Sequence, residues 1–168
     1  MNIDFNTKPK ITLSLDPLLQ AYCRLLFAST PGSKYIIVSR RHIVGKLIHS
    51  FIFPSSLPVN RPLIDNPVTF VLPVRNTNHY IYKSRFIHIP KWAEEKLQDY
   101  IEADFRCWVR ERFEIGYKKK FEQKEIIEAI LRGLNVRNNA ANYDTIKKID
   151  YRYRRKVTEK RFSELLTD

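Results

Sequence analysis

The sequence predicts an α+β protein that is mainly α-helical. Apolar residues recur at helical spacing through much of residues 91–168, whereas residues 1–90 combine two helical patterns with a run rich in β-branched and aromatic residues. Apolar residues make up 43% of the 168 positions, enough for one sizeable core or for a small core with a helical appendage. We therefore expect an N-terminal α+β unit over 1–90, with two helices and a β-hairpin, and a helical C-terminal unit over 91–168.

The first expected helix follows a short polar arm. Asp16 can cap its N-terminus, and Pro17 suits the first helical position because a proline there loses no hydrogen bond. Pro31-Gly32 is expected to end the helix. The apolar residues that share one face of this helix are Leu18, Leu19, Tyr22, Leu25 and Leu26.

The second expected helix comes after a short β-like run over 35–38. Ser39 is a candidate N-cap for this helix, and Gly45 lowers its helical propensity. The four prolines of 54–67 then predict an irregular loop. The inward-facing residues expected on the helix are Ile43, Leu47, Ile48 and Phe51.

A β-hairpin is expected after this loop. Its first strand covers 68–74, its turn runs from Arg75 to Asn78, and its return strand starts at Tyr80. Pro73 cannot donate a hydrogen bond to a neighbouring strand, so it favours an edge position.

The C-terminal unit is expected to hold three helices. A long helix follows Pro90, with acidic residues early and lysines late, as the helix dipole favours, and Gly116 is expected to end or kink it. A shorter helix within 121–133 should have Gly133 as its C-cap, and a basic helix should start at 142–145. The core stripe expected on the long helix is Trp92, Leu97, Ile101, Phe105, Trp108, Val109 and Phe113.

The charge of the chain predicts a polyanionic partner. The formal net charge is +12 and the pI is near 9.8. Nine basic and three acidic residues lie between Arg137 and Arg161, so this segment alone carries a net +6. The other interpretation of such a segment is a charged helix face that only meets water.

A short helix, a turn and a basic helix form the outline of a helix-turn-helix, whose second helix enters the major groove of double-stranded DNA. Asn142 and Thr145 would stand at the N-terminus of the basic helix, where phosphates bind readily. We therefore expect double-stranded DNA as the partner. The residues expected to bind it are Arg137, Asn142, Thr145, Lys147, Lys148, Arg152, Arg154, Arg155 and Lys156.

Four pieces of the segment 86–156 carry a resemblance to a known family. They are Ile-His-Ile-Pro-Lys at 87–91, then 113–121 around a glycine, then 125–136 and 143–155. In this order the segment resembles the C-terminal half of the Mor and C transcription activators of Mu-type phages. The resemblance implies a homodimer that pairs through its upstream part and binds promoter DNA. The contacts it implies are Asn142, Thr145, Lys147, Lys148 and Arg152.

No pattern in the chain predicts a catalytic site, a metal site or a bound cofactor, so we expect no enzyme. His42 and His49 lie seven positions apart, not the four of a helical zinc site. Glu122 and Lys124 have the spacing of some nucleases, but an acid at a helix start is explained by the helix dipole. The chain has only four glycines and two distant cysteines, which excludes a phosphate loop and a CxxC pair.

The sequence predicts a cytoplasmic protein of a bacterial host cell, associated with the nucleoid when bound to DNA. No apolar run approaches the ~18 residues that span a bilayer, so we expect no membrane association. We interpret the chain as a small transcriptional regulator or accessory factor of a phage or mobile element.

Two other functions stay open on the sequence. A structural or assembly protein of a phage particle would turn the same basic surface toward packaged nucleic acid or an acidic partner. A binder of single-stranded nucleic acid or RNA would use exposed tyrosines to stack on bases. The tyrosines that could stack are Tyr80, Tyr82, Tyr151 and Tyr153.

Overall fold

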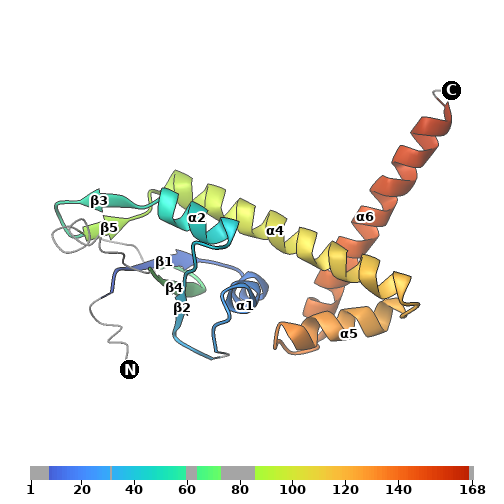
Figure 1. Cartoon of the computed structure of the whole chain (residues 1–168), viewed down its shortest axis with the longest axis horizontal. Helices are drawn as coiled ribbons and strands as arrows, with labels where there is room; N and C mark the ends of the chain where they lie inside the picture. The colour runs from blue at the N-terminus through green and yellow to red at the C-terminus, as the bar shows by residue number, and fades with distance from the viewer. Residues whose placement is uncertain (1–7, 31, 60–63, 73–85, 167–168) are drawn as a thin grey trace. The chain divides into compact units, whose positions relative to one another are not determined.

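The chain is a mainly α-helical α+β protein, as its sequence predicts (Figure 1). The computed structural model describes residues 8–30, 32–59, 64–72 and 86–166. They form two compact units, Met1–Glu102 and Ala103–Asp168. In chain order the elements are β1 (Lys10–Ser14), α1 (Pro17–Leu26), β2 (Tyr35–Ile37), α2 (Ile43–Ser50), β3 (Phe53–Ser55), β4 (Pro67–Val71), β5 (Phe86–His88), α4 (Lys91–Lys118), α5 (Gln123–Gly133) and α6 (Ala140–Leu166).

The first unit is built on a three-stranded sheet in the order β1-β4-β2. Strand β4 lies in the middle, antiparallel to β1 with Leu13 opposite Val68, and parallel to β2 with Ile36 opposite Phe70. These four side chains are almost fully buried, so alternate positions of each strand supply the core.

The predicted hairpin is only partly covered by the described residues. Its turn and most of its return strand fall within 73–85, outside the described part of the chain. The strands on either side of that segment belong to different sheets: β4 joins β1 and β2, whereas β5 pairs with β3 with Phe53 opposite His88. The predicted four-proline loop thus begins inside a short strand, β3, that the sequence did not predict, and its last proline, Pro67, is the first residue of β4.

Helix α1 starts as predicted and stops earlier. The Asp16 carboxylate accepts a hydrogen bond from the Leu18 N–H at 2.9 Å, and Pro17 is the first helical residue. The helix ends at Leu26 rather than at Pro31-Gly32, because Ala28 adopts a left-handed φ of 49°. The stop leaves Leu25 exposed, although its spacing predicted an inward position.

Helix α2 is capped by His42, not by Ser39. The His42 Nδ1 accepts a hydrogen bond from the Val44 N–H at 3.2 Å. Because the helix starts later than predicted, Ile43 is exposed and Val44 and Gly45 are buried instead, whereas Ile48 is buried as predicted. The glycine is a packing residue here: a Cβ on it would lie 1.9 Å from the Ser39 carbonyl oxygen.

The first turns of α4 belong to the first unit, so the boundary between units lies twelve residues beyond the predicted one at 90/91. Glu94 accepts a hydrogen bond from the Ser14 N–H at 3.1 Å, and the Gln98 side chain donates to the Ser14 carbonyl at 2.7 Å. Leu97 and Ile101 are fully buried. Trp92, predicted as core, is half exposed and meets Phe51 and Phe53 through edge-on ring contacts.

The second unit is a three-helix arrangement of the end of α4, α5 and α6. Its core holds Phe113 of α4, Ile127 and Leu131 of α5, and Ile146 of α6, all at most 2% exposed. The apolar spacing of the long helix therefore predicted the buried position of Phe113 correctly. Figure 1 shows the C-terminal half of α6 extending beyond α5 within this unit.

Both predicted glycine helix ends in this unit are wrong. Gly116 lies inside α4, where a Cβ would come within 2.5 Å of the Ile126 side chain, so the glycine permits close packing of α5. The helix ends two residues later, with Lys120 at a φ of 64°. Helix α5 includes Gly133, and the left-handed residue that follows is Asn135, at a φ of 54°.

Candidate nucleic-acid interface

The start of α6 is built by a local cap. The helix begins at Ala140, where the Asn139 side chain accepts a hydrogen bond from the Asn142 N–H at 2.9 Å. The Asn142 amide in turn donates to the Arg137 carbonyl at 2.9 Å. Thr145 donates its hydroxyl to the Ala141 carbonyl at 2.8 Å. The side chains of Asn142 and Thr145, which the sequence predicted as phosphate contacts, thus hydrogen-bond the chain itself.

One face of α6 gathers three of the predicted contacts. Lys148, Arg152 and Arg155 follow one another at spacings of four and three, so they share a side of the helix. With about 100° per residue, this side lies opposite the buried Ile146 and Asp150. All three basic side chains are exposed, and we call them the basic face of α6.

Three other predicted contacts are exposed near this basic face. Lys147 and Lys156 are exposed on its two flanks, and Arg137 is exposed in the segment before the helix. The Arg155 guanidinium lies 2.7 Å from the Glu159 carboxylate, and both side chains are more than half exposed. A pair so open to solvent adds little stability and leaves the arginine accessible to another anion.

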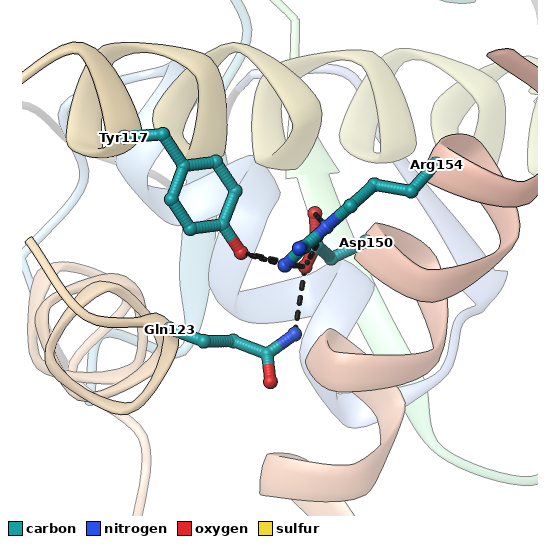
Figure 2. A network of polar contacts seen from close by, with 4 residues as sticks. All are labelled: Tyr117, Gln123, Asp150 and Arg154. Atoms are coloured by element: carbon teal, nitrogen blue, oxygen red, sulfur yellow. Dashed lines mark hydrogen bonds and ion pairs between the residues drawn. The ribbon is translucent and has the colours of Figure 1, made fainter. Parts of the chain in front are cut away.

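Arg154 differs from the other predicted contacts, because its guanidinium is bound inside the protein (Figure 2). It pairs with Asp150, whose side chain is only 1% exposed, and its Nε donates to that carboxylate at 3.0 Å. It also donates to the Tyr117 hydroxyl and covers the tyrosine ring, with 4.5 Å between guanidinium carbon and ring centroid. Arg154 is therefore a structural residue first, although half of its side chain still faces solvent.

The Asp150 carboxylate joins all three helices of the unit. Tyr117 of α4 donates its hydroxyl to one carboxylate oxygen at 2.8 Å, and Gln123 of α5 donates its amide to the same oxygen at 2.7 Å. Figure 2 shows these two side chains and Arg154 converging on the aspartate. A buried carboxylate that accepts several hydrogen bonds and faces a guanidinium is fully satisfied.

The network shifts two pKa values in opposite directions. Burial opposes ionisation of Asp150, but the hydrogen bonds from Arg154, Gln123 and Tyr117 outweigh it and lower the aspartate pKa. Burial and the hydrogen bond to Asp150 raise the pKa of Tyr117 from its usual 10.0 to about 12. The phenol therefore keeps its proton in the range where ordinary tyrosines lose theirs.

These shifts predict how stability depends on pH. The Tyr117 contribution is complete below pH 10 and is lost as pH rises toward 12, because the unfolded state releases that proton first. The Asp150 contribution is present above the usual aspartate pKa of 3.8 and is lost as pH falls below it. In a spectroscopic titration of tyrosinate, we expect a tyrosine that ionises near pH 12 and whose signal disappears in Tyr117→Phe. The hydrogen bond to Glu114 also raises the pKa of Tyr153, and that shift should remain in the variant. An unchanged titration in that variant would contradict the assignment.

Among the tyrosines predicted to stack on bases, the structure distinguishes two. Tyr153 donates its hydroxyl to Glu114 at 2.9 Å, and the Arg110 guanidinium covers its ring at 5.3 Å. Tyr151 is 64% exposed and lies between Lys147 and Arg155 on the helix surface. Tyr151 is thus the better placed of the two for contact with a partner. Tyr80 and Tyr82 lie outside the described residues.

Sequence reasoning missed the tertiary role of Asp150 and its partners. The spacing of four between Asp150 and Arg154 was a signal for an ion pair on one helix. The contributions of Tyr117 and Gln123 had no sequence signal, because both come from other helices.

No family model, curated protein or solved structure matches the chain. Over the described residues, no group of three or more His, Cys, Asp or Glu side chains could hold a metal ion. In the same part of the chain, every helix is too short or too polar to span a bilayer.

Proposed function

We propose that the protein binds double-stranded DNA through α6, as a small transcriptional regulator or accessory factor of a phage or mobile element. The observation that carries this proposal is the basic face of α6: Lys148, Arg152 and Arg155 lie together, exposed, opposite the buried side of the helix. A helix with this arrangement can enter the major groove and neutralise phosphates on both sides of it.

The three-helix arrangement of the second unit supports the same function. Helix α6 follows α5 after residues 134–139 and contacts it, as the second helix of a helix-turn-helix packs on the first, and Ile146 of α6 is buried. The Asp150 network holds the middle of α6 against both neighbouring helices. The basic face is therefore presented on a fixed support, which lowers the entropy cost of binding.

The test is the triple variant Lys148→Ala, Arg152→Ala, Arg155→Ala, measured by fluorescence anisotropy on duplex DNA at several salt concentrations. Each lost phosphate contact reduces the slope of log K against log salt by about 0.9, so we expect a fall of about 2.7 for three contacts and an affinity loss of at least tenfold. An unchanged affinity and slope would refute the proposal.

A matched control is Lys46→Ala, Lys91→Ala, Lys96→Ala, in which three exposed lysines of the first unit are removed. Its net charge falls by the same amount, but its basic face is intact. We expect this control to bind duplex DNA nearly as the wild type does. Equal losses in both triple variants would mean that net charge alone governs binding.

The exposure of Tyr151 specifically favours a second candidate, binding of single-stranded nucleic acid or RNA. An exposed aromatic among cations can stack on an unpaired base, a contact worth about 1–3 kcal/mol. Tighter binding of single strands than of duplexes, lost in Tyr151→Ala, would establish this function in place of the first. The same anisotropy measurements, made with both substrates, decide between the two.

The resemblance to the Mor and C activators also supports a homodimer as the DNA-binding form. The chain has a mass of 20.0 kDa, so sedimentation analysis distinguishes a monomer from a dimer directly. A strict monomer, both free and on DNA, would remove the dimer from the proposal and leave the DNA contact of α6 untouched.

A further inference from the structure

Four lysines cluster where α4 turns into α5. Lys118 is the last residue of α4, Lys119 and Lys120 form the turn, and Lys124 lies in the first turn of α5. We call these four residues the turn lysines. All four are exposed, and within the described part of the chain none of them forms an ion pair.

The helix dipole explains only part of this cluster. A lysine in the last turn of α4, such as Lys118, is favoured by the negative end of the helix. Lys119 and Lys120 lie beyond that end, and Lys124 stands at the positive end of α5, where a cation is disfavoured. The nearby Glu122 and Glu125 form a capping box at the start of α5, in which the Glu125 carboxylate accepts a hydrogen bond from the Glu122 N–H at 2.8 Å.

The backbone at Lys120 adds a second observation. Its φ of 64° is left-handed, a conformation that glycine adopts freely and that is unfavourable for residues with a Cβ. The Phe121 N–H donates to the Gly116 carbonyl at 3.0 Å, and the Lys120 N–H donates to the Tyr117 carbonyl at 3.0 Å, as in a helix end that usually contains glycine. Lysine at this position is thus unfavourable for folding.

The turn lysines lie next to α6. Tyr117 directly precedes them and is hydrogen-bonded to Asp150, while Arg154 covers its ring. Because Asp150 lies opposite the basic face, this contact places the turn beside the middle of α6 on the Asp150 side of the helix, around the helix from the basic face. Arg154, half exposed, lies around the helix between Asp150 on the buried side and Arg155 on the basic face.

We propose that the turn lysines are a second phosphate-binding site, which contacts the backbone of the same duplex beside the groove that α6 enters. The inference rests on the proposed function of α6, and it gives the protein a second cationic contact with the same DNA. Phosphate contacts of this kind carry no base readout and fix the orientation of the protein on DNA. They raise affinity for all sequences alike, in proportion to the counterions that they release.

The variant Lys118→Ala, Lys119→Ala, Lys120→Ala tests the proposal in the full chain. We expect the salt slope to fall by about 2.7 on random-sequence duplex and on any preferred duplex alike. The Lys46, Lys91 and Lys96 triple variant is again the control of equal charge. A turn variant with the wild-type slope, or with no greater loss than the control, would overturn the inference.

The substitution Lys120→Gly separates the binding role from a structural one. Glycine relieves the left-handed strain, so we expect the melting temperature to rise by roughly 2 °C while the salt slope falls by about 1. A lower melting temperature with an unchanged slope would show that the lysine serves only the fold, and would overturn the inference. If the wild-type protein binds no duplex at all, the proposed function itself fails, which is a distinct result.

Discussion

Replacing Arg154 with alanine is expected to destabilise the protein by about 3 kcal/mol, although half of the side chain faces solvent. The loss arises at Asp150, whose carboxylate is 1% exposed and would keep its charge without a cationic partner. Breaking a buried pair costs about 3–5 kcal/mol, and the solvent exposure of this arginine places the effect at the lower end.

Urea unfolding followed by far-UV circular dichroism at neutral pH measures this effect. The matched control is Arg152→Ala, which removes the same kind of side chain from the exposed side of the same helix and should change stability by no more than about 0.5 kcal/mol. If both variants unfold at the same urea concentration, the network does not stabilise the unit as described.

A double variant shows whether the orphaned charge is the cause. With Asp150→Leu and Arg154→Met together, no unpaired carboxylate remains, and stability should recover part of the loss seen in Arg154→Ala. A double variant less stable than the single one would assign the effect to lost packing. For the proposed DNA binding, a weaker complex of Arg154→Ala would therefore report partial unfolding as well as the lost charge.

Substitution Gly45→Ala is the second large effect, with an expected loss of about 3 kcal/mol. The added Cβ would lie 1.9 Å from the Ser39 carbonyl oxygen and 3.2 Å from a methyl group of Val38. Backbone atoms cannot rotate away as a side chain can, so helix α2 would have to shift against the sheet. Thermal and urea unfolding both report the change.

The control for this prediction is Gly133→Ala. A Cβ on Gly133 meets no atom within 4 Å, and the residue is helical, so alanine should stabilise the protein by up to about 0.5 kcal/mol. Opposite signs for two glycine-to-alanine changes in helices would show that packing space, not helical propensity, decides the effect at Gly45. Stabilisation by both substitutions would contradict the close approach at Ser39.

The sequence by itself determined the fold class and most helix faces. The spacing of Leu97, Ile101 and Phe113 on α4 predicted the buried side correctly, because helical period and burial are tied by geometry. It also identified Asp16 as a cap, since that hydrogen bond joins residues only two apart. Local patterns of this kind are complete within one element.

The positions of the helix ends and the roles of two glycines were decided by tertiary packing. The sequence predicted that Gly45 weakens its helix and that Gly116 ends or kinks one. In the structure each position requires glycine, because another segment lies too close to leave room for a Cβ. Lys120 and Asn135 end helices where glycines were expected. No local pattern contains the distance to a distant segment, so these positions could not be predicted from spacing alone.

In the candidate interface, too, local sequence patterns predicted some features and tertiary packing decided others. Charge and helical spacing by themselves brought Lys148, Arg152 and Arg155 onto one exposed face of α6. Only the tertiary structure decided that Arg154, one position away, is paired with the buried Asp150 through contacts that include α4 and α5. The physical reason is that charge is a property of the residue, whereas its partner is set by which helices pack together.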